Sequence, residues 1–305
     1  MALAALTCES LYSFAAAWIR DQAGDLRIPL DGPDAVHDQR VATRRLRMAC
    51  RIFFEDLGGK RWPRQLRNRT RWLGQARQWD VQEALLASLR ESAQDPLEQG
   101  ALEFLQEQAR RRRKKAWRGV EGGFPKDLLK GITGFARRLE TRQDAACGPL
   151  FAWNALHPLL VESFGSLEGL IEAEHPEHMH QTRMAFKRFR YATELLKPSF
   201  VRDQEAFLST AREFQTQLGD HHDLVVLQAF LEAEKARLEQ RGRLILPSGL
   251  ALTLGRLAQK RRGLYEAFRV QGKRVSMEES VRSLRLALGL ALPGETNGSD
   301  PEVSG

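Results

Sequence analysis

The chain has 305 residues, of which 42% are hydrophobic and 28% are charged, a balance typical of globular proteins and unlike that of disordered ones. Lysine and arginine outnumber aspartate and glutamate by 47 to 39, which gives a formal charge of +8 and a pI near 9.7. This surplus favours a polyanionic partner or an anionic surface without choosing between them.

The N-terminal stretch 1–22 is rich in apolar residues but lacks a basic leading region and contains Glu9, so it is typical of an amphipathic first helix rather than a signal peptide. No run approaches eighteen uninterrupted apolar residues, and we expect no membrane-spanning helix. Cys8, Cys50 and Cys147 are too far apart for a metal motif or a disulfide framework, which favours a reducing cytoplasm.

Apolar residues recur every three or four positions over long windows, and alternating β-branched runs are absent, which predicts helices and no sheet. Breaks divide the chain into segments long enough for about ten helices; they lie at 25–34, 56–63, 92–100, 120–125, 146–150, 175–178, 196–200, 241–249 and 271–276. The sequence therefore predicts an all-α protein. The polar tail 293–305 is expected to be disordered.

Two basic segments match each other 143 positions apart: GPDAVHDQRVATRRLRMA at 32–49 and HPEHMHQTRMAFKRFRYA at 175–192. In both, a proline and an acid follow the first residue, which suits a first helical turn. A second match follows in the same order, RWLGQARQWDV at 71–81 against TQLGDHHDLVV at 216–226. Two ordered matches predict an internal duplication. We expect one domain over 1–292, made of two four-helix-bundle-like halves, 1–147 and 148–292, related by pseudo-twofold symmetry.

Laid on a helix, each basic segment separates into two faces. In the first, an arc of about 80° carries His37, Arg40, Arg44, Arg47 and Arg51, and the opposite side carries Ala42, Leu46, Ala49, Cys50 and Phe53. In the second, one face carries His180, Arg183, Lys187 and Arg190, and the other carries Ala185, Phe189, Ala192 and Leu196. Solvated helix faces usually mix signs, because like-charge neighbours cost about 0.2–0.5 kcal/mol each. A positive stripe kept in both copies therefore predicts a functional face.

Arginine suits phosphate, because its planar fork forms bidentate hydrogen bonds with phosphate oxygens. A second basic face carries Arg64, Arg67 and Arg71 and continues through Gln75 and Gln78, while Arg212 matches Arg67 in the second half. Two such helices per half, facing one another, would form a basic groove for a linear polyphosphorylated ligand, although sequence alone does not orient them. The basic run 110–115 covers every side of a helix, and both a solvated turn and a ligand contact remain open for it.

Six of the seven histidines lie in the second half, but their spacing matches no zinc pattern, so no metal site is predicted. His37 and His180 differ from the others because each begins a stripe; they either donate to phosphate or satisfy a helix end. The sequence contains no glycine-rich phosphate loop after a strand, no nucleophile elbow and no paired carboxylates. Neither catalytic residues nor a cofactor are predicted.

These segments resemble the CHAD family, the conserved histidine α-helical domain, in four elements that occur in order: VHDQRVATRRLRMACRIF, RWLGQARQWDV, MHQTRMAFKRFRYATELL and FQTQLGDHHDLVVL. The resemblance covers about residues 8–290. It implies two helical bundles with basic residues facing a central groove or pore, binding of inorganic polyphosphate, and association with polyphosphate granules in the cytoplasm. Relatives are often fused to a triphosphate-tunnel domain, whose ExExK motif this chain lacks, so the chain looks like a stand-alone module.

The resemblance assigns polyphosphate contacts to the basic residues of both motifs: His37, Arg40, Arg44, Arg45, Arg47, Arg51, His180, Arg183, Lys187, Arg188 and Arg190. The halves depart from one another at two positions. Glu194 stands where the first copy has Arg51, and Gln78 replaces an expected acid that Asp223 keeps. These departures predict that the first half contacts the ligand more strongly.

Three classes of function are compatible with the stripes. The favoured one is a non-enzymatic polyphosphate-binding protein, without a membrane partner and with only weak, charge-driven binding of nucleic acid. The alternative is a helical nucleic-acid-binding protein, but the stripes contain no aromatic residue for base stacking and few amides for base edges. The third is an enzyme acting on polyphosphate, which would need a metal-binding carboxylate cluster beside the stripe. The sequence does not set the oligomeric state.

Overall fold

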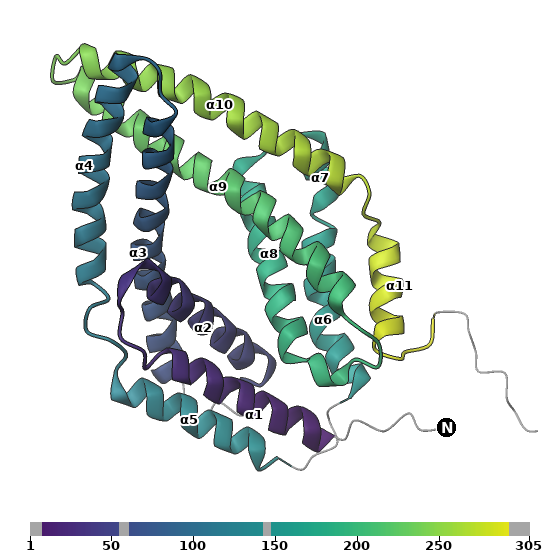
Figure 1. Cartoon of the computed structure of the whole chain (residues 1–305). Helices are drawn as coiled ribbons and strands as arrows, with labels where there is room; N and C mark the ends of the chain where they lie inside the picture. Colours follow the sequence, from purple (N-terminus) through teal and green to yellow (C-terminus); the bar gives the residue numbers. More distant parts are fainter. Residues whose placement is uncertain (1–7, 55–60, 143–147, 293–305) are drawn as a thin grey trace, which may run out of the picture.

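The computed structural model describes residues 8–54, 61–142 and 148–292, and every regular element in these ranges is helical (Figure 1). The first half contains α1 (Cys8–Asp25), α2 (Gly32–Ile52), α3 (Arg61–Glu91), α4 (Pro96–Arg118) and α5 (Lys126–Glu140). The second contains α6 (Pro149–Phe164), α7 (Leu167–Glu172), α8 (Pro176–Leu195), the 3-10 turn η2 (Lys197–Ser199), α9 (Glu205–Glu239), α10 (Ile245–Gly272) and α11 (Met277–Ala287). The all-α prediction is confirmed. The tail at 293–305 lies outside the described residues.

The helix ends follow the local chemistry of the breaks. Both α2 and α8 begin with a proline and an acid, Asp34 and Glu177 respectively, in the first turn, where the missing proline N–H has no helical partner to lose. One break is missed by the sequence pattern, between α6 and α7. At this point a Cβ atom on Gly165 would lie 2.6 Å from the carbonyl oxygen of Val161, so the chain turns at a position where only glycine fits.

The helices of the two halves pack in the same order. In the first half α2 packs against α1 and α3, α3 against α4, and α1 against α5. In the second half α8 packs against α6 and α9, α9 against α10, and α6 against α11 (Figure 1). The halves meet where α4 packs along α10 and where α2 approaches α8. This arrangement brings the two basic segments to the middle of the molecule.

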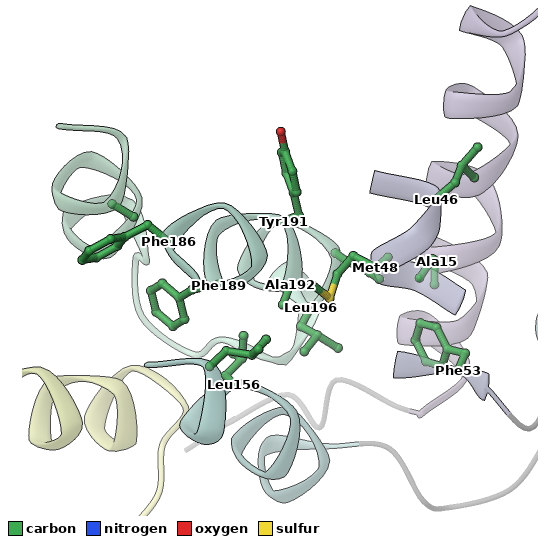
Figure 2. Close-up of a cluster of buried hydrophobic side chains, with 14 of the residues drawn as sticks. Ala15, Leu46, Met48, Phe53, Leu156, Phe186, Phe189, Tyr191, Ala192 and Leu196 are labelled. Carbon is green, nitrogen blue, oxygen red and sulfur yellow. The ribbon is translucent and has the colours of Figure 1, made fainter. Parts of the chain in front are cut away.

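Both large apolar clusters draw side chains from the two halves. The first joins α1, α2 and α5 to α6, α8 and their neighbours. Figure 2 shows Met48 of α2 reaching toward Ala192 of α8 and toward Leu196, which follows that helix. The second joins α3 and α4 to α9 and α10. The predicted core face is confirmed, with Cys50 half-buried and the others buried: Ala42, Leu46, Ala49, Phe53, Ala185, Phe189, Ala192 and Leu196. The face opposite the cations therefore anchors α2 and α8.

Two glycines of α10 provide a test of the α4–α10 packing. A Cβ atom on Gly249 would overlap the carbonyl oxygen of Leu97, whereas one on Gly255 would meet open space. We expect Gly249→Ala to lower the free energy of unfolding by about 1–3 kcal/mol, because a backbone atom cannot move aside. Gly255→Ala should raise it by up to about 1 kcal/mol through helix propensity. Urea unfolding followed by circular dichroism measures both, and equal effects of the two variants would contradict this close crossing.

Candidate functional site

The basic faces of α2, α3 and α8 enclose a cavity of about 620 Å³, here called the central cavity. Met48, Thr70, Gly74, Met184 and Tyr191 form part of its lining. The remaining lining residues are all basic: Arg40, Arg44, Arg47, Arg51, Arg67, Arg71, Lys187 and Arg188. Within the described ranges, no aspartate or glutamate lines this cavity. Six of these eight cations belong to the first half.

Two smaller spaces adjoin the central cavity and share side chains with it. An inner cavity of about 310 Å³ shares Arg40, Arg44 and Lys187, and its lining extends to His37, Arg77, Gln78, His180, Arg183, Asp220, His222 and Asp223. An outer recess of about 390 Å³ shares Arg47, Arg51 and Arg67 and includes Arg64. The basic lining thus continues from Arg64 on one side to Arg183 on the other, and acids appear only at the inner end.

The glycine of the Leu-Gly pair in the second sequence match lies next to an arginine in each half. A Cβ atom on Gly74 would lie 3.6 Å from Nε of Arg40, and one on Gly219 would lie 3.3 Å from Nε of Arg183. Both Nε atoms are buried and have no hydrogen-bond partner. At Gly219 a side chain would crowd Arg183, whereas the distance at Gly74 is an ordinary van der Waals contact with Arg40. In both halves the same arginine of the basic helix lies against the glycine of the next long helix.

The innermost cations are removed from water and repel one another. Burial, followed by the charges of Arg44 and Arg183, lowers the pKa of Arg40 to about 9. Burial likewise lowers the pKa of Arg44 and of Arg183, although Arg44 also forms a hydrogen bond with the Tyr191 hydroxyl. Figure 2 shows this hydroxyl directed away from the apolar cluster. Such a set of desolvated positive charges favours an anion that would replace the lost water.

Lys187 lies among these arginines and is only 6% exposed. In the described part of the chain no acid forms an ion pair with it. Burial is the largest cause, and repulsion by Arg44, Arg183 and Arg40 the next, of a pKa lowered to about 5. Burial and the neighbouring guanidinium groups thus favour the neutral amine of this side chain.

His37 and His180 both line the inner cavity. Burial lowers the pKa of each, and nearby arginines and Lys187 lower it further. Neither side chain bonds a helix end in the described residues, and Nδ1 of His180 is buried without a partner. The ring of His222 lies 4.2 Å from that of His180, and its pKa falls to about 3, mainly through burial. The side chains of His37 and His180 thus line the inner cavity and do not bond the ends of the described helices.

Several predicted site residues lie beside the cavities and contact acids. Arg45 and Arg190 line neither cavity; both contact Glu194, at 3.0 Å and 3.4 Å between the nearest nitrogen and oxygen atoms. Arg188 does line the central cavity and bonds Glu162. Arg212 is exposed, pairs with Glu205 and lines none of the three spaces. Glu194, which replaces an arginine of the first copy, thus joins α2 to α8.

The basic run 110–115 is largely occupied by ion pairs on the flank. Arg110 and Arg113 contact Glu83, at 3.3 Å and 3.5 Å, and Arg113 also bonds Asp80. Arg112 bonds the buried Glu234 and lies over the ring of Phe230, 4.7 Å from its centroid. These contacts tie α4 to α3 and α9, away from the cavities.

Sequence reasoning missed Arg77, Tyr191 and His222 as lining residues. Arg77 had a signal, because Arg67, Arg71, Gly74 and Arg77 follow one another at spacings of three or four residues and so share a helix face. No sequence signal identified Tyr191 or His222, because the residue next to each of them was an equally plausible lining residue.

Two features are absent from the described residues. None of the described helices is long and apolar enough to cross a membrane. In the same residues, no group of three or more histidine, cysteine, aspartate or glutamate side chains is placed to hold a metal ion.

Comparisons with known proteins agree on the fold. Among curated proteins, none matches the chain. The structure resembles the crystal structure of the CHAD domain from the plant Ricinus communis, with a TM-score of 0.55 and 20% identity over 96% of this chain and 95% of that one. It also resembles PptA from Streptomyces chartreusis, with a TM-score of 0.58 and 17% identity over 88% of this chain and 98% of that one. At such identities the likeness concerns the fold alone.

The model of the CHAD domain family matches residues 13–232, which span α2, α3, α8 and most of α9, the helices that build the cavities. This match covers more than half of the sequence, and the chain belongs to the CHAD domain family.

Proposed function

We propose that this protein binds inorganic polyphosphate in the central cavity and its two adjoining spaces. The observation that carries the proposal is the lining of the central cavity, which gathers eight basic side chains and, among the described residues, no acid. An isolated set of buried like charges is unfavourable, and an anion relieves both the repulsion and the lost hydration. Arginine forks match phosphate oxygens in geometry as well as in charge.

The depth of the cations favours a slender anion. Arg40 and Lys187 line both the central and the inner cavity, whereas Arg47, Arg51 and Arg67 line the central cavity and the outer recess. A narrow chain would reach both sets. Linear polyphosphate repeats its charge without bases or sugars, whereas a duplex is too wide to reach the inner pair. The residues proposed to contact phosphate directly are His37, Arg40, Arg44, Arg47, Arg51, Arg64, Arg67, Arg71, His180, Arg183, Lys187 and Arg188.

We also infer that the two halves, 1–147 and 148–292, are a duplicated unit within one domain. The equal packing order of their helices supports this, as do the paired contacts Gly74 with Arg40 and Gly219 with Arg183. Apolar clusters that include both halves support a single domain.

A binding role, rather than catalysis, fits the same lining. Cleavage or synthesis of polyphosphate uses metal-bound carboxylates beside the reacting phosphate, and acids appear only at the inner end, as Asp220 and Asp223. The association of the CHAD family with polyphosphate granules supports a location in the cytoplasm at granule surfaces as part of this proposal.

A competition experiment separates polyphosphate from nucleic acid. Labelled duplex DNA bound by the protein is titrated with long-chain polyphosphate or with unlabelled single-stranded RNA at equal charge concentration. We expect polyphosphate to displace the DNA at a concentration at least ~10-fold lower than RNA, with an affinity that falls steeply as salt rises. If the two polyanions compete equally, the nucleic-acid alternative replaces this proposal.

A matched pair of double variants tests the cavity itself. Arg44→Gln with Arg47→Gln should weaken polyphosphate binding about 10- to 100-fold, since each lost charged hydrogen bond is worth about 1 kcal/mol or more. Arg241→Gln with Arg243→Gln removes the same charge from exposed residues on the α9–α10 turn, far from α2, and should change the dissociation constant less than about twofold. Calorimetric titration measures both. Equal losses would mean that net charge, rather than the cavity, governs binding.

Lys187→Met tests how much the buried lysine lowers the stability of the fold. The lysine pKa is lowered by folding, so the unfolded chain holds an extra proton at pH 7 and the charge opposes folding there. We expect the variant to melt about 2 °C or more above the wild type at pH 7, and the gap to narrow as pH rises toward 10. Polyphosphate should stabilise the wild type more than the variant. Lys197→Met, at an exposed position in η2, is the control. A lower melting temperature for Lys187→Met would contradict this account.

A further inference from the structure

Lys187 combines features that no other lysine in the described chain shares. Its side chain is buried, yet it lines both the central and the inner cavity. It forms no ion pair among the described residues, and guanidinium groups of Arg40, Arg44 and Arg183 act on it from α2 and α8. The other titratable groups that line the inner cavity with it are His37 on α2, Arg77 on α3, His180 on the same helix, and Asp220, His222 and Asp223 on α9.

This environment is that of a nucleophilic amine. A lysine reacts with carbonyl compounds only as the neutral amine, and desolvation beside other cations is the standard way to hold it neutral. Burial and three neighbouring guanidinium groups act together here, and the lowered pKa is their consequence. The carboxyl group of Asp223 acts against them, and burial raises its own pKa.

The cavity also has the means to bring a reactive partner to the amine. Guanidinium groups that surround Lys187 would hold a phosphate or another dianion at one end of a small molecule. The central cavity, about 620 Å³, falls within the range of about 300–1,000 Å³ usual for small-molecule sites. A compound with a phosphate and an aldehyde a few bonds apart would place its carbonyl carbon beside the amine when its phosphate is bound.

We propose that Lys187 is a carbonyl-reactive lysine, and that phosphorylated aldehydes bind in the cavity and form an imine with it. The neutral amine attacks the carbonyl carbon, the nitrogen passes a proton to the carbonyl oxygen to form a carbinolamine, and loss of water leaves the imine. Addition of water reverses the step. The adduct occupies the cavity that we assign to polyphosphate, so this inference rests on the anion-binding character of that proposed site and adds a second, competing class of ligand to it.

Pyridoxal 5′-phosphate is a suitable probe. The intact protein is incubated with it at pH 7, the imine is reduced by borohydride, which delivers hydride to the imine carbon, and the labelled lysines are located by peptide mapping. We expect one label per chain, with Lys187 modified at least tenfold more than exposed lysines such as Lys197 or Lys273. Pyridoxal, which lacks the phosphate, should label Lys187 at least tenfold less. Labelling spread over exposed lysines, with Lys187 unmodified, overturns the proposal.

Two variants complete the test. Lys187→Arg keeps the positive charge but has no primary amine, and should abolish the dominant label, while Lys197→Arg should leave it unchanged. A circular dichroism spectrum and melting curve verify that each variant is folded. Persistence of the dominant label in Lys187→Arg would place the reactive amine elsewhere and overturn the assignment.

Polyphosphate separates this inference from the proposed function. Saturating polyphosphate should reduce labelling of Lys187 at least tenfold. If Lys187 is labelled and polyphosphate neither binds nor protects it, the proposed function fails and the reactive lysine stands. If polyphosphate binds and Lys187 is never labelled, the reactive lysine fails and the proposed function stands.

Discussion

Mutual repulsion among desolvated cations is the constraint around which this molecule is arranged. Burial lowers the pKa of Arg40, Arg44, Arg183 and Lys187, and the charge of Arg183 on α8 lowers the pKa of Arg40 and Arg44 on α2 further. In the described structure no acid lines the central cavity. Such a cluster would drive α2 and α8 apart if charge alone acted. The opposite faces of the same helices hold them in place, because they belong to an apolar cluster that includes residues of both halves. Apolar burial on one face thus sustains an unfavourable electrostatic arrangement on the other.

The distribution of acids shows how this arrangement is confined. Glu194 contacts Arg45 of α2 and so joins α2 to α8, and it also contacts Arg190 within α8. On the flank, Asp80 and Glu234 contact arginines of α4. Acids that pair with arginines therefore lie around the cavities, and among the described residues none lines the central cavity. The lining of the three spaces is basic at the outer side and becomes mixed at the inner end, because among the described residues acids line them only where α9 is present.

Much of the fold and part of the site could be predicted from the sequence. Spacing alone assigns Leu46 and Phe189 to the core and Arg40 and Arg183 to the opposite face, because both properties depend on a helical period that is local. Sequence spacing did not predict where Arg45 and Arg190 lie. The family motif includes both, yet they line neither cavity, because a neighbouring position on a helix points about 100° away and Glu194 lies within reach there.

The sequence by itself determined an all-helical chain, two basic helices with opposed apolar and cationic faces, and a repeated order of motifs. Only the tertiary structure decided which cations lose their water and which find an acid. Sidedness is a property of one helix, whereas burial and pairing depend on what the other helices bring alongside. Lys187 illustrates the difference. In the sequence it is one of several cations on a stripe, whereas in the folded protein burial, and then the arginines of two helices, lower the pKa of its amine in a basic cavity.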